Sequence, residues 1–180
     1  MKKFLRIVQK NVRGSNELHR ELADDAVYAD IWLIQDVGSS YRLIDVADYE
    51  VVVWPGPSRI RVYVRIGLNL GIRNLIQHDE YFPTLEFDSI DLGLVHLHNA
   101  YSSSIGKIDL EDVFAKVSKV DAEHLLMGNF NLRHPDWGGE DVIINHFAAE
   151  RSTTLAAHSS LELLTLRGAK TWEKELGSRT

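Results

Sequence analysis

Four short segments of the chain carry polar side chains that could take part in chemistry. They are residues 9–14 (QKNVRG), 33–36 (LIQD), 96–99 (HLHN) and 126–139 (LMGNFNLRHPDWGG). Each segment places oxygen- or nitrogen-bearing side chains at or just beyond the end of a predicted strand. Catalytic and binding groups gather at strand ends in layered α/β folds. The four segments are therefore the candidates for a functional site.

Each segment also has a purely structural interpretation. Asn11 after a strand suits a turn, and Asp36 suits a solvated turn carboxylate. The glycine and asparagines of residues 128–131 are typical turn residues as well. Single histidines in strands, such as His96, His98 and His124, are usually packed or exposed side chains. Taken one at a time, these segments do not establish a site.

The elements that would position these segments alternate between strands and helices. Residues 31–34 (IWLI) form a continuous apolar run, typical of a strand that is buried on both faces. In residues 60–66, apolar side chains alternate with Arg61, Tyr63 and Arg65, which predicts a half-exposed strand. The other predicted strands are residues 4–8, 49–54, 84–87, 92–98 and 124–127, with short ones near Leu163 and at 170–172. Three helices are predicted: one that begins after Ser15 and runs to about Ala26, one over residues 110–120, and one from residue 142 to about 158.

Strands and helices in this mixed order predict an α/β (α+β) layered sandwich. The first strand, helix and second strand occupy about 35 residues, enough for a right-handed crossover between parallel strands. We find no internal repeat and no linker that would divide the chain. A length of 180 residues fits a single domain, residues 1–180.

Composition narrows the possible functions. The chain is 44% hydrophobic and 26% charged, as expected of an ordinary globular protein. Its net charge of −6 opposes indiscriminate binding to a phosphate backbone but leaves room for a local basic groove. Cysteine is absent, which excludes disulfides, thiolate metal sites and thiol nucleophiles. No run approaches the roughly 20 apolar residues of a membrane span. We therefore expect an intracellular protein, nuclear or cytoplasmic, without membrane contact.

The order and spacing of the four segments resemble the endonuclease/exonuclease/phosphatase superfamily, most of all the endonuclease domains of fungal-type non-LTR retrotransposons. The family pattern Q-W-N-x-x-G is matched by residues 9–14, and L-L-Q-E by residues 33–36. The strand R-V-A-x-Y-V is similar to residues 59–64, and G-D-F-N-L-H-H-P-x-W-G-G to residues 128–139. Residues 168–180 are similar to the segment before the family's S-T-I-D-L motif. The resemblance covers essentially the whole chain, and the match at 128–139 is the specific one.

The resemblance implies two mixed β-sheets flanked by helices and a divalent metal, usually Mg²⁺, that promotes phosphodiester hydrolysis at the strand ends. Hard oxygen ligands suit Mg²⁺, which neutralises charge on the phosphate in the transition state. The resemblance places Asn11 and Asp36 at the metal, and Asn129 and Asn131 at catalytic positions. His98 falls at or beside the family's active-site tyrosine. Substrate contacts are implied for Asn11, Asn99, Arg133 and Trp137.

Three departures from the family pattern bear on activity. Asp36 stands in place of a glutamate and reaches about 1.5 Å less far. A misplacement near 1 Å can cost on the order of 100-fold in rate. Asn129 stands in place of an aspartate, and a neutral amide neither accepts a proton nor holds a hydroxide. The sequence stops at Thr180, before the family's last strands and the histidine of its S-D-H segment. The resemblance therefore implies a domain that is incomplete at its C-terminus and lacks that histidine, with Mg²⁺ bound weakly or lost.

These departures favour a catalytically dead or strongly impaired nuclease-like domain that is retained as a binding or interaction module. The alternative is a Mg²⁺-dependent DNA endonuclease seen as a weakly active, truncated or mutated fragment. A phosphatase acting on a small phosphorylated ligand is a third class.

Two kinds of partner follow from the same reasoning. A missing final strand would expose a sheet edge, which a protein partner or a second copy could cover. DNA is the other candidate, because basic side chains could form a rim and Trp54 and Trp137 could stack on bases. Solvated arginines and packed tryptophans explain the same residues. The basic residues concerned are Arg6, Lys10, Arg13, Arg59, Arg61, Arg65 and Arg133.

Overall fold

The computed structural model describes residues 4–15, 29–37, 47–52, 58–68, 70–102, 108–119, 121–132, 134–138, 147–162 and 164. Its strands are β1 (Ile7–Asn11), β2 (Ile31–Gln35), β3 (Tyr49–Val52), β4 (Ile60–Arg65), β5 (Gly71–Asp79), β6 (Phe82–Ser89), β7 (Gly93–Tyr101) and β8 (Glu123–Asn129). Its helices are α2 (Leu110–Val117), α3 (Pro135–Gly138) and α4 (Phe147–His158). The helix predicted after Ser15, the end of the strand predicted at 49–54, and the strands predicted near Leu163 and at 170–172 lie outside the described residues. The helix predicted from residue 142 is described from Phe147 onward.

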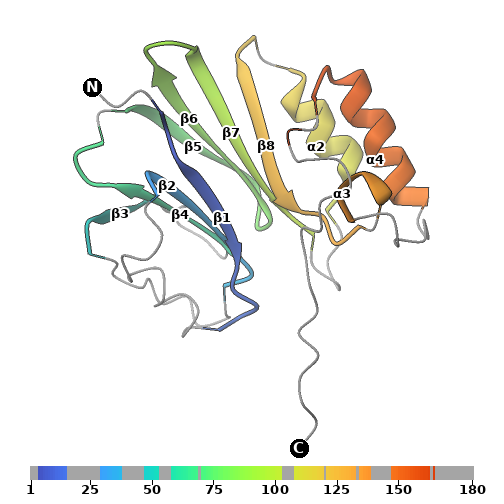
Figure 1. The fold of residues 1–180 in the computed structure, drawn as a ribbon, viewed down its shortest axis with the longest axis horizontal. Helices are drawn as coiled ribbons and strands as arrows, with labels where there is room; N and C mark the ends of the chain where they lie inside the picture. The colour runs from blue at the N-terminus through green and yellow to red at the C-terminus, as the bar shows by residue number, and fades with distance from the viewer. Residues whose placement is uncertain are drawn as a thin grey trace, which may run out of the picture.

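The strands form two sheets that pack face to face, with helices beside one of them (Figure 1). The first sheet has the order β1-β2-β4-β3 and the second has the order β5-β6-β7-β8. The pairs β1–β2 and β7–β8 are parallel, and the other neighbours are antiparallel. Helices α2 and α4 lie side by side, and α2 packs on the outer face of the second sheet. The predicted layered sandwich of two mixed sheets is confirmed.

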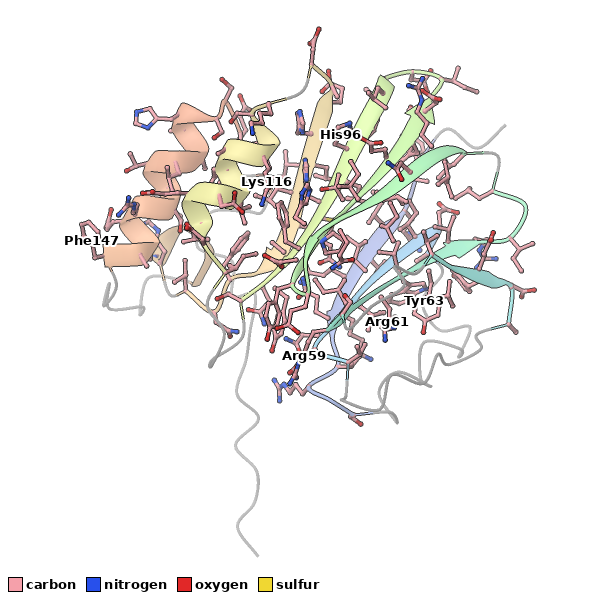
Figure 2. The ribbon with its side chains drawn as sticks, turned by 180° about the vertical axis from the view of Figure 1, so that it is seen from behind. Arg59, Arg61, Tyr63, His96, Lys116 and Phe147 are labelled. Carbon is pink, nitrogen blue, oxygen red and sulfur yellow. The ribbon has the colours of Figure 1, made fainter. Side chains whose placement is uncertain are left out.

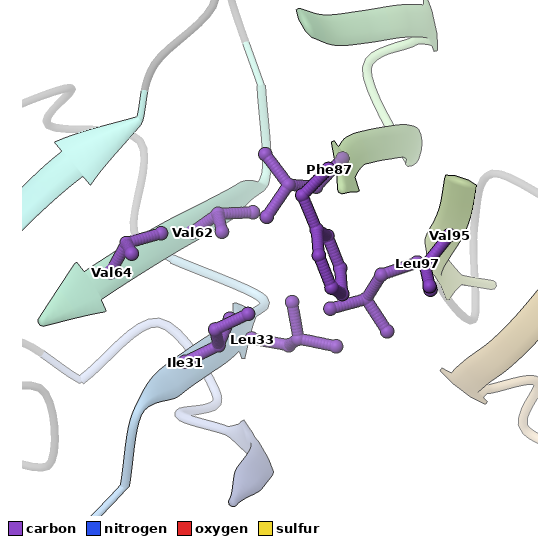
Figure 3. Packing of buried hydrophobic residues seen from close by; sticks show 8 residues of the cluster. Ile31, Leu33, Val62, Val64, Phe87, Val95 and Leu97 are labelled. Atoms are coloured by element: carbon purple, nitrogen blue, oxygen red, sulfur yellow. The ribbon is translucent and has the colours of Figure 1, made fainter. Parts of the chain in front are cut away.

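The main core lies between the two sheets. Ile31, Leu33, Val62 and Val64 of the first sheet meet Leu85, Phe87, Val95 and Leu97 of the second (Figure 3). The alternate residues of β2, Trp32 and Ile34, are buried on the opposite face of the first sheet. Strand β2 is therefore buried on both faces, as its continuous apolar run predicted.

The prediction of a half-exposed strand at residues 60–66 is wrong. Tyr63 is 1% exposed and packs with Trp32 and Ile34 in the cluster on the outer face of the first sheet. Arg61 is also buried, and its guanidinium donates to the carbonyls of Ser58 at 2.7 Å and Ile60 at 2.8 Å (Figure 2). Alternation of residue types failed here because local carbonyls satisfy the arginine and further side chains cover the tyrosine.

Several strands differ from the predicted boundaries, β6 and β8 being longer at both ends, and one strand was not predicted. The strand predicted at residues 4–8 begins at Ile7 instead, and Phe4 is 84% exposed. Asn11 is therefore the last residue of β1, and β7 similarly extends to Tyr101. Strand β5 has no clear alternation of polar and apolar residues, and its pairing with β6 has two register irregularities. Pairing with β6 rather than a sequence pattern defines it.

Helix α2 covers part of the outer face of the second sheet. Asp109 caps its N-terminus by accepting a hydrogen bond from the backbone N–H of Glu111 at 2.9 Å. The helix was predicted to reach residue 120 and ends at Val117. Val113 and Val117 are buried against Phe82 and Ala100 of the sheet. None of the described helices is long and apolar enough to cross a membrane.

Candidate functional site

The ends of β1, β2, β7 and β8 meet at one edge of the sandwich. In the parallel pairs, Asn11 lies opposite Gln35 and Tyr101 lies opposite Asn129. Gln35 joins the two sheets because its Nε2 donates to Asn99 Oδ1 at 2.5 Å and to the Ala100 carbonyl at 2.9 Å. The predicted gathering of polar segments at the strand ends is therefore present, and we call this group the strand-end site.

Gln35 is fully buried and holds the site together. Besides its two bonds to β7, its Oε1 accepts a hydrogen bond from Gln9 Nε2 at 3.0 Å. Asn99 is 1% exposed, and its Nδ2 has no hydrogen-bond partner within the described residues. A buried amide N–H without a partner is uncommon in folded proteins. Asn99 therefore presents an unused donor at the strand ends, where a substrate contact was predicted for it.

Asp36 forms an ion pair with Arg59. Arg59 Nη1 donates to Asp36 Oδ1 at 2.9 Å; Arg59 is labelled in Figure 2. The Asp36 side chain is 20% exposed and the Arg59 side chain is 44% exposed. The Asp36 backbone has a positive φ of 54°, a conformation that aspartate tolerates better than most residues. The loop of Asp36 and the start of β4 are further joined by the Val37 N–H, which donates to the Arg59 carbonyl at 3.1 Å. The one predicted metal-binding carboxylate is thus already neutralised by an arginine.

Tyr101 is a member of the strand-end site that the sequence analysis did not predict. Its hydroxyl lies close enough to the side chains of Asp36 and Asn11 for both to affect its pKa. Burial raises the pKa of Tyr101 to about 12, and the negative charge of Asp36 acts in the same direction. The hydroxyl therefore stays protonated at neutral pH and is a hydrogen-bond donor. Alternation along β7 could have identified it, because Tyr101 lies two residues after Asn99 and so projects from the same face.

Three asparagines at the strand ends hold turns or neighbouring backbone through their side-chain amides. Asn11 Oδ1 accepts from the Arg13 backbone N–H at 2.9 Å, and Asn129 Oδ1 accepts from the Asn131 backbone N–H at 3.1 Å. Asn131 has a positive φ of 51°, and its Nδ2 donates to the Ser102 carbonyl. These contacts support the turn interpretation, and the three asparagines lie at the strand ends, where their catalytic or metal-binding roles stay a prediction.

Of three other predicted site residues, the structure describes the side chain of His98 alone. His98 lies on the opposite face of β7 from Asn99, buried and bonded to Thr84 and His124. It is therefore apart from the strand-end site, to which β7 contributes Asn99 and Tyr101 instead. Arg133 lies outside the described residues, and so does the side chain of Trp137, whose backbone belongs to α3.

The basic residues proposed as a rim are divided between the two ends of the first sheet. Arg59 lies at the strand-end site, and Lys10 and Arg13 flank Asn11 in the chain. Arg6 and Arg65 lie at the other end, where the backbone N–H groups of both bond to Asp30. Arg61 is buried and adds nothing to the surface. The described basic residues therefore form no single continuous rim.

The described side chains fit a tight magnesium site poorly. Mg²⁺ is held in proteins through one or two carboxylates with water or substrate oxygens. The predicted site residues supply one carboxylate, Asp36, whose charge is balanced by Arg59 at 2.9 Å. The oxygens of Asn11 and Asn129 already accept backbone hydrogen bonds. We therefore derive no catalytic step through a metal at this site.

No family model matches the sequence, and no curated protein matches it. Among solved structures, the chain is similar to "Endonuclease domain of TRAS1, a telomere-specific non-LTR retrotransposon", with 16% sequence identity and a TM-score of 0.65. The alignment covers 89% of this chain and 74% of that chain. At this identity the match shows the fold. The resemblance predicted from the four segments is thus confirmed as a shared endonuclease-type fold.

Proposed function

We propose, from the premise that the chain has the fold of a retrotransposon endonuclease domain, that it is a nuclease-like domain with strongly impaired catalysis that acts by binding. One observation carries the proposal: Asp36, the only carboxylate among the predicted site residues, is paired with Arg59 at 2.9 Å. A divalent cation would have to compete with that guanidinium. Asn129 adds a second deficit, because its amide cannot act as a general base.

The experiment is a nicking assay on supercoiled plasmid with Mg²⁺ or Mn²⁺. We expect the wild-type chain to nick no faster than an Asp36→Ala variant, the matched control for contaminating nuclease. Asn129→Asp alone should change little, because Asp36 would still be paired with Arg59. Robust metal-dependent nicking by the wild-type chain that disappears in Asp36→Ala would overturn the proposal.

That overturning result would establish the alternative, a Mg²⁺-dependent endonuclease that hydrolyses phosphodiester bonds in DNA. The contacts that favour this alternative are those of Tyr101 with Asn11 and Asp36. A protonated tyrosine hydroxyl in this position is suited to donate a hydrogen bond to a phosphate oxygen. A Tyr101→Phe variant would then lose nicking activity while keeping its fold.

The binding role has two proposed partners with separate tests. Because the described arginines form no continuous rim, we expect few phosphate contacts, so DNA affinity should be weak and should fall only gently with added salt. Fluorescence anisotropy with a labelled duplex measures this, and an Arg59→Ala variant tests the basic side chain at the strand ends. A protein partner or a second copy along a sheet edge is the other possibility. Sizing over a range of concentrations tests self-association, and a monomer at every concentration would remove that possibility.

A further inference from the structure

Three histidines gather on the outer face of the second sheet, apart from the strand-end site. His96 and His98 lie two residues apart on β7, and His124 of β8 lies opposite His96. One ring nitrogen from each histidine lies within 4.8 Å of the other two. Ala100, the next residue of β7 on this face, packs in the cluster of Val113 and Val117 of α2. The group therefore sits on the sheet face that α2 covers; His96 is labelled in Figure 2.

The spacing of these nitrogens is close to that of ligands around one metal ion. Four-coordinate zinc with Zn–N distances of about 2.0–2.1 Å places its ligand nitrogens roughly 3.3 Å apart. His98 Nε2 and His124 Nδ1 are 2.9 Å apart. The His96 ring lies edge-on to both other rings, with centroids 6.0 Å from that of His98 and 5.2 Å from that of His124. Since the three ligand nitrogens lie within 4.8 Å of one another, a ring shift of at most about 1.5 Å would bring them to this spacing.

A buried nitrogen without a hydrogen bond points to a ligand at this position. His96 is 3% exposed, and its Nε2 forms no hydrogen bond. Glu86 Oε1 lies 3.2 Å from that nitrogen, as an ion-pair contact and not a hydrogen bond. Buried polar atoms nearly always form hydrogen bonds, so an imidazole nitrogen that forms none beside two further imidazoles needs an explanation. A bound metal ion would order this ring and engage one of its nitrogens.

Neighbouring side chains can hold His98 in the orientation of a ligand. Thr84 Oγ1 lies 2.8 Å from His98 Nδ1 and 2.9 Å from His78 Nε2. If His98 Nδ1–H donates to Thr84, the Thr84 hydroxyl donates in turn to His78, and the Nε2 lone pair of His98 faces His124. A hydrogen bond of this kind on the far nitrogen is the usual support of a metal-binding histidine.

We propose that His96, His98 and His124 bind one transition-metal dication of the zinc class. Three imidazoles suit Zn²⁺, Cu²⁺ or Ni²⁺ and do not suit Mg²⁺, which prefers oxygen ligands. Glu86 contributes a nearby negative charge, and the positive charge of Lys116 on α2 is paired with Asp112. The metal would join β7 to β8 and stabilise the sheet beneath α2. This proposal is independent of activity at the strand-end site.

The experiment is a Zn²⁺ titration of the full chain, measured by isothermal titration calorimetry. The chain is first treated with a chelator, which is then removed. We expect one Zn²⁺ per chain, and Co²⁺ in its place should give the visible absorption bands of a low-symmetry nitrogen site. His124→Gln should weaken binding at least 10-fold, because second and third ligands each add strongly to affinity. His158→Gln is the matched control, because His158 is exposed at the end of α4. It should leave binding unchanged.

Zn²⁺ binding that is undiminished in His124→Gln, or absent from the wild-type chain, would overturn the proposal. If His124→Gln does not fold, modification of wild-type histidines by diethylpyrocarbonate, read by mass spectrometry, decides instead. His124 is half-buried and so can react in the metal-free protein. Zn²⁺ should protect His124 and leave His158 reactive. Equal modification of His124 with and without Zn²⁺ would then refute the site.

Discussion

Acid should destabilise the metal-free protein through His98. Burial, together with smaller contributions from the neighbouring imidazoles of His124, His96 and His78, lowers the pKa of His98 from 6.5 to about 3. The unfolded chain therefore binds a proton near pH 6.5, while the folded chain does so only near pH 3. Between these values the unfolded state holds more protons, so the free energy of unfolding falls as the pH falls. Stability is lost below pH 6.5, not above it.

The size of this loss of stability follows from the difference between the His98 pKa values of the unfolded and folded chains. A single group contributes about 1.4 kcal/mol per pH unit in this window, so lowering the pH from 6.5 to about 5 costs roughly 2 kcal/mol. His98 is 1% exposed, so solvent screening does not reduce this figure much. Ordinary carboxyl groups titrate near pH 4 and contribute little above pH 5. Typical domains are stable by about 5–15 kcal/mol, so a loss of this size is readily measured.

The assay is urea unfolding followed by circular dichroism, with a chelator present, at several pH values between about 5 and 7. His98→Gln removes the titrating group, so the slope of stability against pH should decrease by up to about 1.4 kcal/mol per pH unit, whatever its stability at neutral pH. His158→Gln, exposed on α4, should keep the wild-type slope. Equal slopes in the wild-type chain and His98→Gln would refute the reasoning.

Two further predictions concern packing at the strand ends. Gly128→Ala should destabilise the protein by about 1–3 kcal/mol, because the new Cβ would lie 2.5 Å from the Ala100 carbonyl oxygen. Gly71→Ala is the control, because there the new Cβ would lie 3.2 Å from Asp88, whose half-exposed side chain can move aside. Equal losses of stability in the two variants, measured by urea unfolding, would contradict the explanation. Gln35→Met keeps the volume but removes the hydrogen bonds to Asn99 and Ala100, and should cost about 2–4 kcal/mol. An unchanged unfolding midpoint would show that this buried bridge between the sheets contributes little.

Much of the fold follows from local pattern. The apolar run of β2 indicated burial on both faces, and its side chains belong to the core clusters on the two faces of the first sheet. The helix expected at residues 110–120 is present as α2, because its apolar spacing and the Asp109 cap favour a helix locally. The mixed order of these elements indicated a layered sandwich, which the structure confirms.

Other features depended on contacts that no local pattern contains. Arg61 and Tyr63 look like the solvent side of a strand, but carbonyl groups and a second cluster of side chains bury them. The pairing of Asp36 with Arg59 joins residues 23 positions apart and changes what the carboxylate can bind.

The sequence by itself placed asparagines, an aspartate and histidines near strand ends, and so located the candidate site. Only the tertiary structure decided which face of β7 each side chain occupies. Because side chains alternate along a strand, a shift of one residue moves a side chain to the other face of the sheet. Tyr101 therefore joins Asn11 and Asp36 at the strand-end site, while His98 turns away toward His96 and His124.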